Sequence, residues 1–228
     1  KTYCTVTATQ WALLSITLLA GAATPGASLA LVINTATKYG RLAGIIQSLA
    51  HGIGVGFYAL LVSMGISSIL FASAYAFQML QLAGCVLLVY LGGKMILGGW
   101  QSRHTSDLGL ASTKAHSAKA LFVKSSSIWS HTSKGFLIVF LNPKIALFFF
   151  AVFSQFLHVG QHQILQWTMA SLAGVIDALW YLAIAILVSI PSVSNVLNRF
   201  GWQLDILWGS VIVAIAAALM INLSSTGL

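Results

Sequence analysis

Two stretches of this chain place a proline inside a long apolar run: Ala23-Thr24-Pro25-Gly26-Ala27-Ser28 and Leu141-Asn142-Pro143-Lys144-Ile145. A proline inside a helix removes one backbone hydrogen bond and clashes with the carbonyl four residues back. In lipid the freed carbonyl finds no water, so such a break is tolerated only where protein or a wet cavity satisfies the backbone. Breaks near the start of each half of a small membrane protein indicate a binding site built from broken helices.

The composition is that of an integral membrane protein. The chain has 228 residues, of which 58% are hydrophobic and only 6% are charged. A soluble domain carries about 25% charged residues, and so few charges cannot cover a water-facing surface. The net charge of +8 comes from basic residues that mostly flank apolar segments. Membrane topology explains this pattern, and we expect no nucleic-acid partner.

Six apolar segments reach the length of about 20 residues that a membrane span needs. We therefore predict an all-α, polytopic membrane protein with spans near Trp11–Ala36, Leu42–Phe71, Phe77–Leu97, Gly135–Leu157, Ile164–Ile190 and Trp202–Leu223.

The polar segment Gly98–Lys134 divides these spans into two groups of three. We predict a single transmembrane domain, 1–228, made of a first half (1–98), a cytoplasmic linker (99–134) and a second half (135–228). Because each half has an odd number of spans, the second half is inverted relative to the first. Each half then begins with a proline-broken helix, the pattern of an inverted repeat.

The basic residues predict the orientation. The segments that follow or end the first, third and fifth predicted spans carry Lys38, Arg41, Lys94, Arg103, Lys114, Lys119, Lys124, Lys134 and Arg199. The opposite side has only Lys1. By the positive-inside rule the three basic loops face the cytoplasm, and both termini face outward.

Asp177 is the only acidic residue predicted to lie deep in the membrane. At about 1.5 Å per residue, Pro25, His51, Lys144 and Asp177 share the middle zone of an apolar core about 30 Å thick. A charged side chain at a helix centre costs about 2.5 to 3.5 kcal/mol on insertion scales, so it should face the interior and have a partner. Asp177 either carries a proton or balances a solute ammonium, or it is a structural acid paired with Lys144 or His51.

Lys144 and the Pro25-Gly26 break each have two interpretations. Lys144 either offers its charge to a carboxylate or extends its long side chain to the cytoplasmic interface. If a helix restarts after Pro25, the amides of Gly26, Ala27 and Ser28 attract an anion such as a carboxylate. The alternative is a simple kink that helps helix packing.

Three other polar residues have less specific readings. His51 precedes glycines that allow close helix packing, and is either a packed, hydrogen-bonded histidine or a proton relay. Lys94 and Asp205 fall near span ends, and we interpret both as interface residues.

Several stretches between about Gly21 and Trp180 occur in a characteristic order: Ala23-Thr24-Pro25-Gly26-Ala27-Ser28, Tyr39-Gly40-Arg41 with Gly44, Ala83–Lys94, Gly135-Phe136, Leu141–Phe149 and Asp177-Ala178-Leu179-Trp180. This ordered set resembles the LysE/RhtB family of amino-acid exporters. The chain departs from the family pattern at Ala27 and Ser28, where relatives usually have Pro followed by Asn or Asp. Val55 stands where some relatives carry an acidic residue.

The resemblance implies a secondary transporter of the bacterial inner membrane that exports amino acids or related small metabolites, driven by the proton gradient. Its expected partners are a small-molecule substrate and the lipid bilayer, with no cofactor and no metal; a homodimer is left open. An amino acid is a zwitterion, so its site needs a positive and a negative feature. The residues expected to bind substrate are Thr24, Pro25, Gly26, Ser28, Asn142, Pro143 and Lys144; Asp177 is expected to couple protons, with His51 as a further candidate.

Two other functions fit the sequence less well. An intramembrane serine enzyme needs a nucleophile and a base at one depth, and Gly65-Ile66-Ser67-Ser68 resembles a nucleophile motif only superficially. A metal exporter needs clustered cysteines or carboxylates. Cys4 and Cys85 are the only cysteines, belong to no CxxC pair and are a weak signal for a disulfide. We therefore expect a transporter and not an enzyme.

Overall fold

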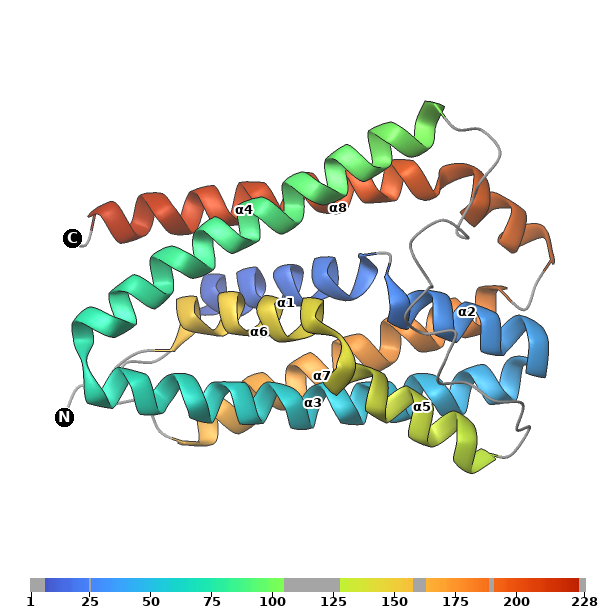
Figure 1. Ribbon diagram of the computed structural model, residues 1–228, viewed down its shortest axis with the longest axis horizontal. Helices are drawn as coiled ribbons and strands as arrows, with labels where there is room; N and C mark the ends of the chain where they lie inside the picture. The colour runs from blue at the N-terminus through green and yellow to red at the C-terminus, as the bar shows by residue number, and fades with distance from the viewer. Residues whose placement is uncertain (1–6, 25, 105–127, 158–162, 189–190, 226–228) are drawn as a thin grey trace.

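The structure is a computed structural model that describes residues 7–24, 26–104, 128–157, 163–188 and 191–225. Within these ranges it contains eight helices and no strand (Figure 1). The helices are α1 (Ala8–Ala23), α2 (Ala27–Tyr39), α3 (Arg41–Ala72), α4 (Ala74–His104), α5 (Ile128–Leu141), α6 (Pro143–Phe156), α7 (Gln163–Val188) and α8 (Pro191–Ser225).

These eight helices provide four candidate membrane spans, or six if each bent pair is one span. Helices α3, α4, α7 and α8 are each long and apolar enough to cross a membrane. The pairs α1/α2 and α5/α6 pass the same test jointly, and each pair is bent by 61° at its break. The predicted polytopic, all-α fold with a broken first helix in each half is therefore confirmed. Pro25 itself lies outside the described residues.

The two halves run in opposite directions. In Figure 1, α1 and α2 run from the end where α8 finishes toward the opposite end, whereas α5 and α6 run the other way. Helix α3 packs along α7, and α4 along α8, each as an antiparallel pair. Helix α2 of the first half packs on α7 of the second half, and α6 of the second half packs on α3 of the first. These two equivalent contacts are expected when the halves are inverted copies of one arrangement.

Several helices extend beyond the predicted spans. Helix α4 continues to His104, α5 begins at Ile128 and α8 begins at Pro191 instead of Trp202. Hydropathy marks only the apolar part of a helix, whereas backbone hydrogen bonding continues into the polar flanks. Pro191 suits the first position of a helix, where its missing N–H is not needed.

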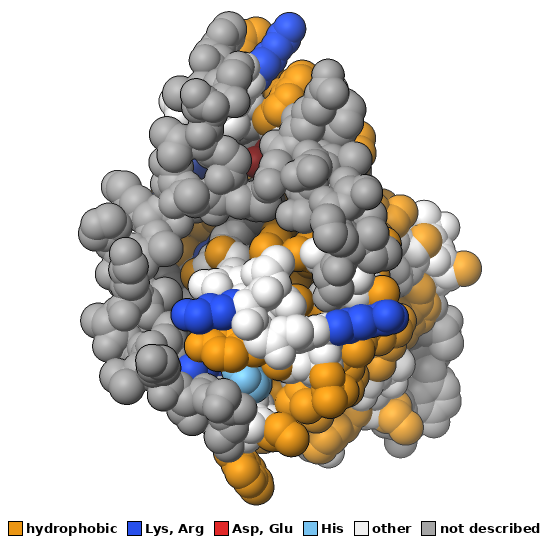
Figure 2. Space-filling view, turned by 90° about the vertical axis from the view of Figure 1, so that its right-hand side faces the viewer, with side chains coloured by type: hydrophobic (Ala, Val, Ile, Leu, Met, Phe, Trp, Pro, Cys, Tyr) orange, Lys and Arg blue, Asp and Glu red, His pale blue; other side chains and the backbone are white. Residues whose placement is uncertain are grey.

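Apolar side chains cover the outside of the bundle, and basic side chains lie at one end of it. Large apolar residues on the outside of the bundle, such as Ile53 and Ile164, are strongly exposed, as expected for a surface that faces lipid. The basic side chains gather at the end that holds the turn between α2 and α3 (Figure 2). We call this the basic end; its described basic residues are Lys38, Arg41, Arg103 and Lys134.

Helices α3 and α7 cross in backbone contact because glycines line the crossing. A Cβ atom added to Gly174 would lie 2.8 Å from the carbonyl oxygen of Gly52 and 3.1 Å from Cα of Gly56. Helix α7 repeats small residues at four-residue spacing, Ala170, Gly174 and Ala178, the pattern that allows close helix approach in membranes. This crossing joins the two halves at the middle of the bundle.

We expect Gly174→Ala to destabilise the protein, because the new methyl group meets backbone atoms that cannot rotate away. Overpacking of this kind costs about 1 to 3 kcal/mol. The matched control is Gly65→Ala on α3, where an added Cβ meets nothing within 4 Å. Thermal unfolding in detergent should show a lower Tm for Gly174→Ala and an unchanged or higher Tm for Gly65→Ala. Equal Tm values for both variants would contradict the tight crossing.

Candidate functional site

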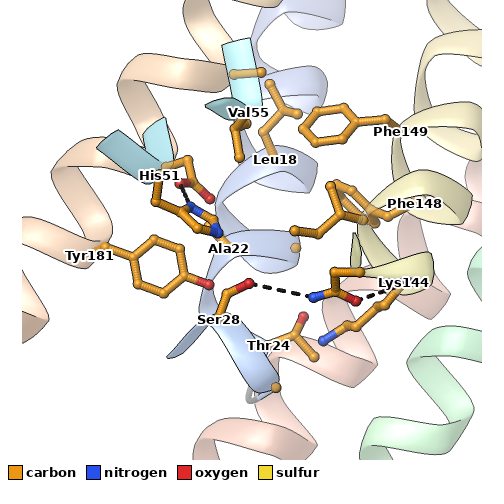
Figure 3. A pocket seen from close by; sticks show the side chains of 16 residues that line it. Leu18, Ala22, Thr24, Ser28, His51, Val55, Lys144, Phe148, Phe149 and Tyr181 are labelled. Atoms are coloured by element: carbon orange, nitrogen blue, oxygen red, sulfur yellow. Dashed lines mark hydrogen bonds and ion pairs between the residues drawn. The ribbon is translucent and has the colours of Figure 1, made fainter. Parts of the chain in front are cut away.

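A cavity of about 50 Å³ lies at the two helix breaks, enclosed by residues of α1, α2, α3, α6 and α7 and by the breaks themselves (Figure 3). A single water needs about 10 to 15 Å³ of such space, so the cavity holds several waters or a small solute. Seven residues expected from the sequence line it: Thr24, Gly26, Ser28, His51, Asn142, Lys144 and Asp177. Of the other two, Pro143 occupies the first position of α6, and Pro25 lies outside the described residues.

The first break ends α1 and restarts the chain as α2. The Thr24 hydroxyl donates to the carbonyl of Ala20 at 2.8 Å, and the Thr24 N–H donates to the carbonyl of Gly21 at 3.3 Å. Gly26 is the N-cap of α2, and the described residues give this helix start no side-chain cap. The first amides of a helix have no partner within it, so those of α2 are available to a ligand in the cavity.

The second break is capped, and its cap reaches across to the first half. Asn142 Oδ1 accepts a hydrogen bond from the Lys144 N–H at 3.1 Å, which is the preferred role of asparagine at a helix N-cap. Asn142 Nδ2 donates to the Ser28 hydroxyl at 3.4 Å. One side chain thus satisfies the start of α6 and links the two breaks.

One side of the cavity is positive. The starts of α2 and α6 both adjoin it, and each helix start carries a partial positive charge. The Lys144 amine lies next to Thr24 in Figure 3, 3.5 Å from the position that a Cβ on Gly26 would take. Of the two predicted alternatives for Lys144, the structure therefore places the side chain along the cavity.

Asp205 on α8 lies four residues into the candidate span Gly201–Ile221, near a span end as interpreted from the sequence, and is half-buried. It interacts electrostatically with Lys144, and its Oδ1 atom is buried without a hydrogen-bond partner among the described residues. Helix α8 starts before the apolar segment, and Asp205 faces Gly99 of α4, whose added Cβ would lie 3.2 Å from Cβ of Asp205. Hydropathy could not reveal this burial, which depends on how α8 packs on α4.

The other side of the cavity holds its carboxylate. Asp177 Oδ2 lies 2.6 Å from Nδ1 of His51, and both residues are buried. Of the two partners that the sequence allowed for Asp177, this is His51. The ring of Tyr181 stands edge-on to the imidazole at 4.7 Å between centroids. Nε2 of His51 is buried and has no hydrogen-bond partner among the described residues.

The sequence did not indicate several other lining residues. Tyr181 follows Asp177 by four positions and Phe148 follows Lys144 by four, so helical spacing alone would have placed each pair on one face. Toward the end opposite the basic end the walls are apolar, with Leu18, Phe148 and Phe149. Val55, the position that is acidic in some relatives, is also part of the wall.

Up to six spans in inverted halves, with two broken helices around one small cavity that carries both polar and apolar groups, form an architecture typical of secondary transporters. The model of the LysE type translocator family matches residues 19–223, so the chain belongs to this family.

The curated relatives agree with this assignment. The chain is 26% identical over 162 residues to the uncharacterised membrane protein YrhP of Bacillus subtilis, covering 69% of this chain and 73% of the relative. It is 26% identical over 168 residues to the homoserine/homoserine lactone efflux protein of Salmonella typhimurium (72% and 71%). It is 23% identical over 198 residues to the threonine efflux protein of Escherichia coli (87% and 91%). No solved structure matches significantly.

Family and relatives therefore point to a transporter and not to an enzyme. In the described parts of the chain, no three His, Cys, Asp or Glu side chains lie together as a metal site would require.

We expect Asn142→Ala to lower stability by about 1 kcal/mol, the usual cost of losing an N-cap. Asn142→Ser is the matched comparison, because serine caps about as well as asparagine but is too short to reach Ser28. If the link to Ser28 adds to stability, thermal unfolding in detergent will rank the wild type above Asn142→Ser, and Asn142→Ser above Asn142→Ala. An unchanged Tm for Asn142→Ala would show that this cap does not stabilise the break.

Proposed function

We propose that this protein exports amino acids, or closely related small metabolites, from the cytoplasm by proton antiport. The observation that carries this proposal is the charge pattern of one small cavity, with Lys144 and two helix starts on one side and the His51–Asp177 pair on the other. The printed names of two relatives, for threonine and homoserine efflux, support the substrate class.

A zwitterion fits this pattern. Its carboxylate binds at the uncapped start of α2 and at the Lys144 amine, where backbone N–H groups and a full charge act together. Its ammonium binds on the opposite wall at the His51–Asp177 pair. The cavity volume of about 50 Å³ favours small solutes.

The same pair accounts for coupling to protons. A neutral imidazole beside a carboxylate gives the His51–Asp177 pair one negative charge. One added proton, on either residue, makes the pair neutral overall. The negative form attracts an ammonium and the neutral form does not, so a proton and a substrate compete for the pair. Substrate binding should therefore release a proton and should weaken as the pH falls.

The basic end supports an orientation. Basic loops stay on the cytoplasmic side of membranes, so we place the basic end in the cytoplasm and both termini outside, in the inner membrane of a bacterium. The halves 1–98 and 135–228 then move against each other around the cavity, joined by the cytoplasmic linker 99–134.

Counterflow in liposomes tests the carrier directly. Vesicles loaded with unlabelled threonine or homoserine should accumulate the matching labelled compound through the wild-type protein. No counterflow for any amino acid would remove the proposed substrate class.

We expect Asp177→Asn to abolish proton-driven flux and to weaken amino-acid binding, because the pair loses its negative form. The measurements are proton release into a pH-sensitive dye and substrate affinity as a function of pH. The same substitution at Asp107, in the predicted linker, is the control and should change neither. Wild-type proton release from Asp177→Asn would exclude Asp177 as the coupling residue.

We expect Lys144→Gln to weaken binding of an amino acid roughly tenfold, the loss of one charge-assisted contact. Binding of the amine that lacks the carboxylate should change little, because it never used this contact. Lys94→Gln is the control, since the Lys94 amine lies over the ring of Tyr90 on the same helix and away from the cavity. Equal losses for amino acid and amine would mean that Lys144 does not bind the carboxylate.

A further inference from the structure

Gln47 on α3 is the most unusual buried polar residue outside the cavity. Its side chain has no solvent exposure, and neither Nε2 nor Oε1 has a hydrogen-bond partner among the described residues. Buried polar groups in proteins are almost always paired with protein or with water. A carboxamide with both ends unpaired by described protein groups therefore points to water or to a polar ligand as its partner.

Gln47 is placed to continue the cavity toward the basic end. It precedes His51 by four residues, so the two side chains are neighbours on one helix face. His51 lines the cavity, and its Nε2 is the other unpaired polar atom on this face. The unpaired groups thus form a row that starts at the cavity and runs one helical turn toward the basic end.

The row lies beside a seam between the two halves. Gln47 packs against α5, where a Cβ added to Gly135 would lie 3.1 Å from Cγ of Gln47. Helix α2 belongs to the first half and α5 to the second, and both pack on α3. At the basic end they meet through the rings of Tyr39 and His131, whose centroids are 5.0 Å apart. His131 is buried in this contact.

We propose that the seam between α2 and α5 is the route between the cavity and the basic end, and that Gln47 is a binding subsite on it. Its carboxamide offers a donor to a carboxylate and an acceptor to an ammonium, which suits a small zwitterion in transit. Because Gln47 is uncharged, it binds more weakly than the cavity and lets the solute continue. The direction of travel, from the cytoplasm into the cavity, rests on the proposed function.

The broken helices supply the movement that this route needs. Helix α2 begins at the break at Gly26 and α5 finishes at the break at Asn142, so each can tilt without bending the helix on the other side of its break. In the present conformation the Tyr39–His131 contact closes the outer part of the seam, and Gly135 closes it over Gln47. Opening separates these two contacts and hydrates the carboxamide.

Transport kinetics give the first test, with reconstituted full-length protein and labelled threonine. Gln47→Leu should lower the counterflow rate roughly tenfold, since the solute loses its hydrogen bonds on the route, and should leave equilibrium binding in the cavity within about twofold. Ser48→Ala is the matched control, because Ser48 is equally buried but its hydroxyl donates to the Gly44 carbonyl within the helix. A wild-type rate for Gln47→Leu, or an equal loss of rate and binding, would overturn the subsite.

Thiol labelling gives a second test that needs no knowledge of the substrate. In a Cys4→Ser, Cys85→Ser background, a charged, membrane-impermeant thiol reagent should modify Gln47→Cys at least about tenfold faster than Ser48→Cys, the excess expected of a hydrated wall over a packed one. This excess should appear only when the reagent reaches the basic end. Equal rates at the two cysteines, or faster labelling from the opposite end, would overturn the route.

The two tests separate failure of the route from failure of the proposed function. Rapid labelling of Gln47→Cys without counterflow of any amino acid would support the route and refute the substrate class. Amino-acid counterflow at the wild-type rate in Gln47→Leu, with slow labelling, would refute the route alone.

Discussion

The structure depends on one constraint: a backbone that is interrupted inside a membrane must have its polar groups satisfied by the protein or by a wet cavity. Each break meets this requirement differently. At the first, the Thr24 hydroxyl bonds back to Ala20 while α2 starts without a side-chain cap. At the second, Asn142 caps α6 and also donates to Ser28 of the other break. The breaks therefore have to adjoin each other, and the polar cavity is the space that they share.

The pairing of charged side chains follows from the same need to satisfy polar groups inside the membrane. The described spans contain two acidic residues, and each has a base near it: Asp177 lies against His51, and Asp205 interacts with Lys144. Pairing lowers the cost of holding charge in the membrane. It also sets the polarity of the cavity, since both members of the His51–Asp177 pair line one side and Lys144 lines the other. The separation of signs that suits a zwitterion thus arises from the pairing.

The sequence predicted the features that depend on hydropathy and on proline. Six spans follow from apolar length, and the broken helices follow from Pro25 and Pro143, whose chemistry does not depend on neighbours. Depth arithmetic placed His51, Lys144 and Asp177 in one zone, and the structure places all three in the wall of one cavity.

The remaining features depend on how the helices rotate and pack. Asp177 had two candidate partners in the sequence, and only the α3–α7 crossing through Gly52 and Gly174 selects His51. The burial of Asp205 and of Gln47 requires knowing which neighbours cover α8 and α3. The true ends of α4, α5 and α8 lie in polar sequence that hydropathy does not mark.

The two ends of the cavity also differ in chemistry, and this difference bears on how it opens. Between the cavity and the basic end lie the buried polar side chains of Gln47 and His131, whereas toward the other end the lining is apolar, with Leu18, Phe148 and Phe149. A polar seam closes weakly, because water competes for its groups when it opens, whereas an apolar seam closes by excluding water. Between them, the glycine crossing of α3 and α7 holds the halves in backbone contact. If the halves move as proposed, this crossing is the pivot, because a shift there would make backbone atoms that already touch overlap, whereas tilting at the breaks moves only the helices on either side.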